Sequence, residues 1–151
     1  MSFMNNVFDP NRHSYYQPLN PKKYIGKQLP ICRSSYETAF CKWCDTNTNI
    51  LEWVSEPFAI RYYDPVKRKK RRYYPDFFVK VRDSSNNERS YVIEIKPLKE
   101  VNRPTGRGSK KSQIREATTY ATNASKWNAA NNWCVKKGWE FKIVTEKELF
   151  K

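Results

Sequence analysis

Two short apolar runs carry charged residues where a strand normally buries only hydrophobic side chains. Residues 74–79 contain Asp76 directly after Pro75, and residues 91–96 contain Glu94 and Lys96. Alternate side chains of a β-strand point to opposite faces, so Glu94 and Lys96 share one face while Ile95 lies on the other. Because an unpaired buried charge is costly, the pattern indicates a bound divalent cation that holds the two carboxylates together.

The segment between the two runs predicts how they pair. Residues 83–88 are Asp, Ser, Ser, Asn, Asn and Glu, which is typical of a hairpin loop. A hairpin that pivots at Ser85 places Asp76 opposite Glu94. A pivot half a residue later places Asp76 opposite Ile95 and separates the carboxylates, and the sequence leaves both registers open. The alternative is a surface hairpin in which Glu94 and Lys96 pair on a solvated face.

Periodicity predicts the remaining elements. Ser34 followed by Glu37 forms a capping-box pattern that opens an amphipathic helix ending near Asp45. Strands are expected at 50–54, 57–63, 72–82, 90–96 and 139–143. Two short helices are expected at 114–121 and 127–134, the second closing at Gly138, and a last one begins at Thr145. The predicted order is α-β-β-β-β-α-α-β-α.

The chain is expected to form one domain with an irregular arm. Its 151 residues are enough for a single hydrophobic core but few for two. Residues 1–32 carry many Pro, Asn and Tyr residues without a period, which is typical of an extended segment. We therefore assign residues 1–32 to the arm and residues 33–151 to the domain.

The charge balance indicates a polyanionic partner. The sequence has 29 basic and 15 acidic residues, a net charge of +14, and DNA is the first candidate. A membrane surface is the rival, but no apolar run approaches the roughly 20 residues of a membrane span and no signal peptide is evident, so we expect a soluble intracellular protein. The cations expected to bind DNA lie in a solvated hairpin tip (Lys67, Arg68, Lys69, Lys70, Arg71, Arg72) and in a mobile loop between Pro97 and Lys111 (Arg103, Arg107, Lys110, Lys111).

The cysteines and the single histidine offer little chemistry. Cys41 and Cys44 form a CxxC pair, which raises the question of a zinc site. Cys44 continues the apolar stripe of the predicted helix, however, so a buried structural thiol is the favoured interpretation. His13 is the only histidine and lies in the irregular arm, so we expect no histidine-based catalytic triad.

Taken together, these segments resemble the PD-(D/E)XK nuclease superfamily. An Asp after Pro on one strand, Glu-x-Lys on the next and a Glu on the N-terminal helix carry the resemblance. Four segments resemble the catalytic domain of TnsA-type endonucleases: 35–37, 74–77, 92–97 and 138–149. The whole short chain resembles the head-completion nucleases of T4-like bacteriophages. The resemblance implies an α/β, restriction-endonuclease-like α-β-β-β-α-β core, with a mixed central sheet flanked by helices.

The resemblance also implies roles for individual residues. Asp76 and Glu94 would hold Mg²⁺, with Mn²⁺ as its substitute, the backbone carbonyl of Ile95 would complete the shell and Glu37 would add a third carboxylate. Lys96 would orient or deprotonate the attacking water, or stabilise charge in the transition state. For Glu37, helix capping alone remains the alternative. Gln113 would be an auxiliary polar residue of the site.

The expected function is a Mg²⁺-dependent deoxyribonuclease, endonucleolytic or exonucleolytic, that processes packaged DNA before head-tail joining. The resemblance implies phage head or portal proteins as partners, in the host cytoplasm during assembly and then within the virion head. Two other classes stay open. The chain could be a non-catalytic DNA-binding or portal-docking protein on a nuclease-like fold, or, from its charge alone, an RNA-binding module.

Overall fold

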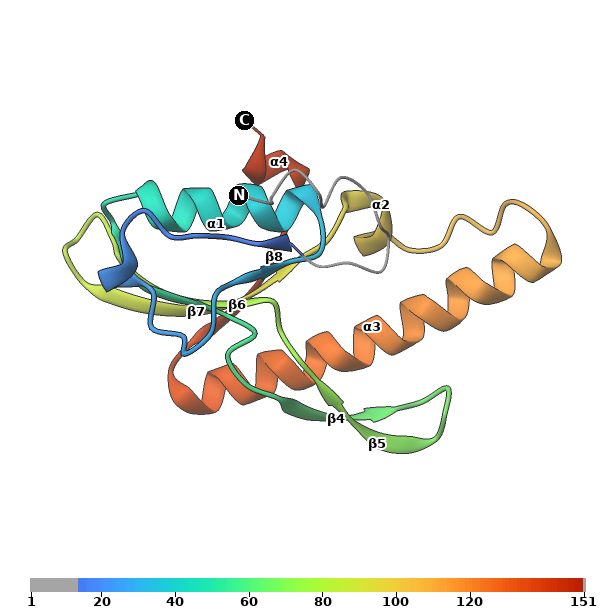
Figure 1. The fold of residues 1–151 in the computed structure, drawn as a ribbon. Helices are drawn as coiled ribbons and strands as arrows, with labels where there is room; N and C mark the ends of the chain where they lie inside the picture. The colour runs from blue at the N-terminus through green and yellow to red at the C-terminus, as the bar shows by residue number, and fades with distance from the viewer. Residues whose placement is uncertain (1–13, 151) are drawn as a thin grey trace.

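Two helices lie on opposite faces of one four-stranded sheet (Figure 1). The computed structural model describes residues 14–150; His13 and the first part of the arm lie outside them. The core elements are α1 (Ser35–Thr46), β3 (Ile50–Ser55), β6 (Phe77–Arg82), β7 (Glu88–Ile95), α3 (Lys110–Lys137) and β8 (Glu140–Val144). This order is the expected α-β-β-β-α-β core, so the restriction-endonuclease-like fold is confirmed.

The sheet has the order β3-β6-β7-β8, in which β7 and β8 are parallel and the other neighbours antiparallel. Phe77 pairs with Ile93 and Val79 with Tyr91, which is the register of a hairpin pivoting at Ser85. The first of the two registers is therefore confirmed. It decides which side chains share a face, because a shift by one residue would turn every side chain over.

Alternation along β6 and β7 supplies a separate core to each helix. Phe77, Val79, Ile93 and Ile95 belong to the cluster that contains Phe40, Cys41 and Cys44 of α1. On the other face, Phe78 and Val92 pack with Cys134 of α3. All four cysteines are free and buried, so the prediction of structural thiols is confirmed.

The prediction of two short helices between the last two strands is wrong. Residues 110–137 form one 28-residue helix, which Ser109 caps at the start and Gly138 ends in the left-handed conformation at φ +75°. The polar residues near Asn123 interrupt the apolar period, but no Gly or Pro lies between Lys110 and Lys137 to break the backbone. The expected basic loop is correspondingly shorter, since it contains α2 (Leu98–Val101), and Lys110 and Lys111 belong to the first turn of α3.

The predicted strand at 72–82 is also wrong, because it consists of two strands in different sheets. β5 (Lys69–Tyr73) pairs with β4 (Ile60–Asp64) in a separate two-stranded ribbon, and β6 starts after Pro75. Proline has no N–H for a strand ladder and restricts the residue before it, so the chain changes direction there. The basic run is therefore not a solvated tip alone: Lys67 and Arg68 lie in the turn, and residues 69–72 lie in β5.

The described part of the arm packs against the domain. β1 (Ser14–Tyr15) pairs with β2 (Ile31–Cys32), and the 3₁₀ helix η2 (Pro21–Lys23) lies between them. Fully buried Asp45 of α1 accepts hydrogen bonds from this segment. At the other end, α4 (Glu146–Leu149) has the predicted capping box at Thr145. None of the helices within residues 14–150 has the length and apolar character needed to cross a membrane.

Candidate active site

Asp76 and Glu94 meet at the edge of the sheet where β6 begins and β7 ends. Asp76 directly precedes β6, and the observed register continues to Glu94 on β7. Asp76 Oδ2 accepts the backbone N–H of Ile95 at 2.8 Å, while the Glu94 side chain is buried with a residue exposure of 7%. Two strands that are antiparallel neighbours thus bring two acidic groups to one point.

The electrostatics of this pair are unfavourable without a counter-ion. The pKa of Asp76 is raised to about 7, chiefly by burial and also by the charge of Glu37, although the Ile95 N–H opposes the shift. The pKa of Glu94 is likewise raised to about 7, chiefly by burial and also by the charge of Asp76. A bound cation would reverse both shifts, because an opposite charge favours the ionised carboxylate.

Lys96 lies on the same face as Glu94, as the alternation predicts. Its Nζ is 3.8 Å from Glu94 Oε2, and its side chain keeps 28% of its surface exposed. Ile95, between them, points into the core beside α1. The Lys96 charge lowers the pKa of both carboxylates, but burial and mutual repulsion outweigh it. The ammonium is therefore beside the carboxylates and still reaches solvent.

Glu37 both caps α1 and lies near the carboxylate pair. Its N–H donates to Ser34 Oγ, and its own carboxylate accepts from the Ser34 hydroxyl, each at 3.2 Å. The predicted capping box is thus only half formed, since the Glu37 carboxylate takes the hydroxyl instead of the Ser34 N–H. Glu37 lines a cleft of about 650 Å³ together with Ile95 and Lys96. Burial raises the pKa of Glu37, and the charge of Glu94 contributes to this.

The ligand atoms available at this edge are oxygens, the type that a hard divalent cation prefers. Asp76 and Glu94 offer carboxylate oxygens. The N–H of Ile95 points toward Asp76, and a strand residue directs its N–H and C=O to the same neighbour, so the Ile95 carbonyl faces this side too. Within residues 14–150, no cluster of three or more His, Cys, Asp or Glu side chains is arranged to bind a metal. Two carboxylates and one carbonyl, with water, are an ordinary Mg²⁺ set.

Two residues that the sequence analysis missed contact Glu94 or lie beside it. The Tyr73 hydroxyl, at the end of β5, donates to Glu94 Oε1 at 2.5 Å. Lys126 of α3 lies with its Nζ 5.8 Å from the centre of the Tyr73 ring, and its charge lowers the pKa of Glu94. The only local indication of a role for Tyr73 in the sequence is its position three residues before Asp76. No local signal marks Lys126, because a helix far along the chain delivers it.

Glu56 is a further acidic residue that the sequence analysis did not select. It follows β3 with φ +47°, an uncommon conformation for a non-glycine residue. Its N–H donates to the Asp76 carbonyl at 2.8 Å, and its carboxylate pairs with Arg33 at 3.0 Å. Its charge also raises the pKa of Asp76. β3 thus brings a third acidic residue to the same end of the sheet, already neutralised by an arginine.

The structure does not bring Gln113 to this site. Its side-chain amide donates to the Gly108 carbonyl at 2.9 Å, and its position on α3 is about 20 Å along the helix axis from Lys126. The N-terminal half of α3 extends beyond the sheet (Figure 1). Lys110 and Lys111 lie in the first turn of α3, and Arg103 and Arg107 lie in the loop between α2 and α3.

Comparisons with known proteins agree with this geometry. A family model described as "TnsA-like endonuclease N terminal" matches residues 47–146, a span that includes Asp76, Glu94 and Lys96. The chain is also 39% identical over 138 residues to the head completion nuclease of Enterobacteria phage T4, covering 87% of this chain and 89% of that protein. The resemblance expected from the sequence is thereby confirmed, and the chain belongs to the TnsA-like endonuclease N-terminal family.

Proposed function

We propose that this protein is a metal-dependent deoxyribonuclease of the PD-(D/E)XK type. The observation that carries the proposal is the convergence of Asp76 and Glu94 at the β6–β7 edge, with Lys96 Nζ 3.8 Å from Glu94. A structural protein gains nothing from two facing, poorly neutralised carboxylates, since they oppose folding. The family assignment and the printed name of the phage T4 relative support the same activity.

Each residue has a chemical task in this proposal. Asp76, Glu94 and the Ile95 carbonyl would hold Mg²⁺, or Mn²⁺ in its place, and Glu37, which lines a cleft with Ile95 and Lys96, would add a further carboxylate. When bound, the ion would polarise the phosphodiester and acidify a water molecule. Lys96 would orient that water or stabilise negative charge on the phosphate oxygens. The Tyr73 hydroxyl donates to Glu94 Oε1, and the other carboxylate oxygen, Oε2, is the one that lies near Lys96.

Cleavage of supercoiled plasmid DNA in Mg²⁺ and in EDTA tests the proposal. We expect activity in Mg²⁺ alone, and a loss of about a hundredfold or more in Asp76→Asn and Glu94→Gln, because each removes a charge that the transition state needs. Glu140→Gln, an exposed carboxylate on β8, is the matched control and should stay active. Full activity in both site variants would remove these residues from the mechanism.

The same assay separates the competing classes. DNA binding without cleavage under any divalent ion would favour the non-catalytic DNA-binding protein. Equal affinity for single-stranded RNA and duplex DNA, with cleavage of neither, would favour the RNA-binding module.

We further propose that the nuclease acts during phage head completion, in contact with DNA and head or portal proteins, first in the host cytoplasm and then within the head. The name of the phage T4 relative supports this role. Purified heads should contain the chain, as mass spectrometry can measure. Infection with the Asp76→Asn variant should yield heads that incorporate the protein and fail to join tails; normal tail joining would contradict the role.

A further inference from the structure

The β4–β5 ribbon has two chemically different faces. Arg61 pairs with Arg72 and Tyr63 pairs with Lys70; we call these four residues the outer face. The alternate positions form the inner face: Ile60, Tyr62, Asp64, Lys69, Arg71 and Tyr73. The continuous basic run of the sequence is thus divided between two surfaces.

The inner face is occupied by contacts within the protein. Ile60, Tyr62 and Tyr73 are buried in a cluster with Ala130 and Trp127 of α3. Arg71 pairs with buried Asp64 at 3.2 Å, and Lys126 lies over the Tyr62 and Tyr73 rings. The Ser125 hydroxyl also donates to the Tyr63 carbonyl at 2.5 Å. These contacts fix the ribbon on α3 and leave its outer face free.

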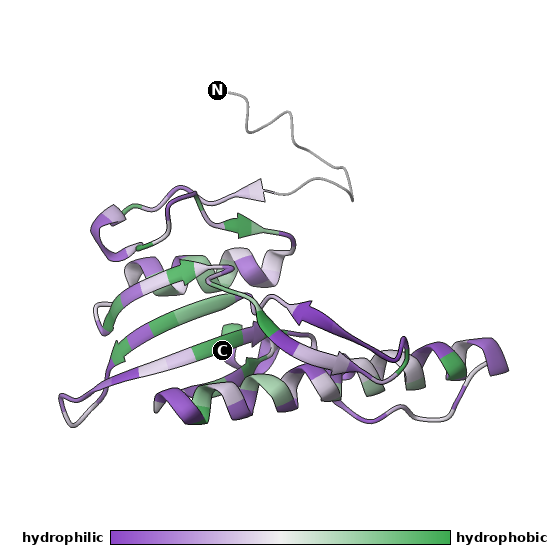
Figure 2. Cartoon of the chain, turned by 90° about the horizontal axis from the view of Figure 1, so that it is seen from below, coloured by the Kyte–Doolittle hydropathy of each residue, from purple (hydrophilic) through white to green (hydrophobic). Residues whose placement is uncertain are grey.

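The outer face is exposed and carries cations without acidic partners. Arg61, Lys70 and Arg72 are all exposed, and none of them takes part in an ion pair within residues 14–150. Tyr63, 53% exposed, lies among them. Figure 2 shows β5 as a hydrophilic strand beside the largely hydrophobic sheet. Arg61 lies directly opposite Arg72, so this face contains two like charges side by side. Their repulsion destabilises the ribbon when no anion is bound.

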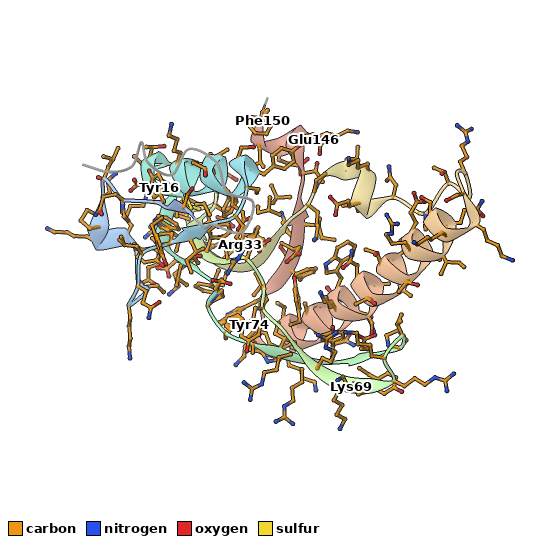
Figure 3. The ribbon with its side chains drawn as sticks, turned by 45° about the vertical axis from the view of Figure 1, so that its right-hand side comes forward. Tyr16, Arg33, Lys69, Tyr74, Glu146 and Phe150 are labelled. Carbon is orange, nitrogen blue, oxygen red and sulfur yellow. The ribbon has the colours of Figure 1, made fainter. Side chains whose placement is uncertain are left out.

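The ribbon leads directly into the candidate active site. Tyr73 at its end holds Glu94, and Arg72 is so few residues before Asp76 that their Cα atoms lie at most about 14 Å apart. In Figure 3, Tyr74 lies between Lys69 on the ribbon and Arg33 at the start of α1. Duplex DNA advances about 3.4 Å per base pair, so the Cα separation of Arg72 and Asp76 corresponds to at most about four base pairs.

We propose that the outer face of the ribbon is a phosphate-binding surface for duplex DNA, in which Arg61 acts together with Lys70 and Arg72. Phosphate contacts relieve the repulsion between Arg61 and Arg72, which nothing in the described protein neutralises. Arg71, although part of the same basic run, lies on the inner face and pairs with Asp64, so it is not included. The proposal rests on the proposed function in that DNA is the substrate.

Salt-dependent binding tests the proposal independently of cleavage. Fluorescence anisotropy with a short blunt duplex, in EDTA, gives the log-log slope of affinity against salt between about 50 and 200 mM. The triple variant Arg61→Ala/Lys70→Ala/Arg72→Ala should lower the magnitude of that slope by about 2 to 3, since each lost phosphate contact removes about 0.9. Its melting temperature should be unchanged or higher than that of the wild type, because a repulsive pair is gone.

Lys22→Ala/Lys42→Ala/Lys136→Ala is the matched control, since it removes the same charge from exposed positions on η2, α1 and the end of α3. Its slope should remain that of the wild type. Equal loss of slope in both triple variants would overturn the proposal, because net charge alone would then explain binding. One strand of that duplex, used alone, serves as a second probe, and a slope loss confined to the single strand would overturn the assignment to duplex DNA.

Failure of this proposal and failure of the nuclease function give different results. If the outer-face variant binds like the wild type while plasmid cleavage still depends on Asp76, the binding surface is wrong and the nuclease stands. If the outer-face variant loses binding while no divalent ion supports cleavage, the surface stands and the nuclease proposal is wrong.

Discussion

Asp45 and the Asp76–Glu94 pair are acidic groups in opposite environments. The Asp45 carboxylate accepts the Tyr16 hydroxyl and the Leu19 N–H at 2.7 Å each, and the Asn20 N–H at 2.9 Å. Burial alone would raise its pKa, but these hydrogen bonds outweigh burial and lower it. Asp76 accepts one backbone N–H, lies beside another carboxylate and has a raised pKa.

The contrast separates a structural charge from a functional one. Asp45 ties the described arm to α1 and is fully hydrogen-bonded, as buried charges usually are. Asp64 follows the same rule, with two backbone N–H groups and Arg71 as donors. Asp76 and Glu94 are also hydrogen-bonded, to the Ile95 N–H and the Tyr73 hydroxyl, but their pKa values stay raised. Perturbed pKa values of this kind are typical of binding and catalytic sites.

Lys96→Met should abolish most DNA cleavage while leaving the fold intact. Lys96 is partly exposed and its charge lies beside the site, not in the core, so its loss should lower kcat by about 10²–10³ with little change in melting temperature. Plasmid cleavage and circular dichroism measure the two quantities. Lys136→Met, on an exposed turn of α3, is the control; a similar loss there would show that general charge is responsible.

Asp45→Ala should instead lower the stability of the fold. It leaves three donors without their acceptor, so the free energy of unfolding should fall by about 3 kcal/mol or more, as urea unfolding would measure. Glu88→Ala removes only an exposed pair at 3.9 Å and should cost less than about 1 kcal/mol. Equal costs for the two variants would contradict the structural role of Asp45.

The pH dependence of metal-free stability should have opposite signs at the two places. Because the folded pKa of Asp45 lies below its unfolded value, its contribution is present above pH of about 4 and is lost as pH falls further. Asp76 and Glu94 have folded pKa values of about 7. Between pH of about 4 and 7 the folded state therefore binds more protons than the unfolded state. The contribution of the two carboxyl groups to stability decreases as pH rises through that window.

Asp76→Asn should therefore raise metal-free stability at pH 8 by on the order of 1–2 kcal/mol. In thermal melts it should also remove the stabilisation that Mg²⁺ gives the wild type, because ligand binding to the folded state alone raises the melting temperature. A destabilised Asp76→Asn protein would show that the carboxylate is structural, like Asp45.

Tyr73→Phe should give the smallest effect. Losing one hydrogen bond to Glu94 should lower cleavage about three- to tenfold. The Tyr73 hydroxyl also lowers the pKa of Glu94, so its loss should move the acid limb of the pH–rate profile to higher pH. Lower activity with an unmoved profile would mean that Tyr73 only maintains packing.

Much of the sheet could be predicted because its signals are local. The turn residues around Ser85 limited the hairpin to two registers, one of which the structure has, and alternation set the faces of Ile95 and Lys96. The prediction was wrong where a local signal had two meanings. Pro75 separates two strands instead of lying within one, and the polar residues around Asn123 continue α3 instead of ending a helix.

The amino-acid sequence by itself limited Asp76 to two positions, opposite Glu94 or opposite Ile95, because a hairpin is built from neighbouring residues and a turn; the structure has the first register. Only the tertiary structure decided what surrounds the two carboxylates. Tyr73 reaches Glu94 because β5 belongs to a separate ribbon, and Lys126 is supplied by α3, the helix that covers the Glu94 face of the sheet. It also divided one basic run into Arg72 on the outer face and Arg71 on the inner face. Such contacts depend on how elements pack, and packing joins residues that no local period relates.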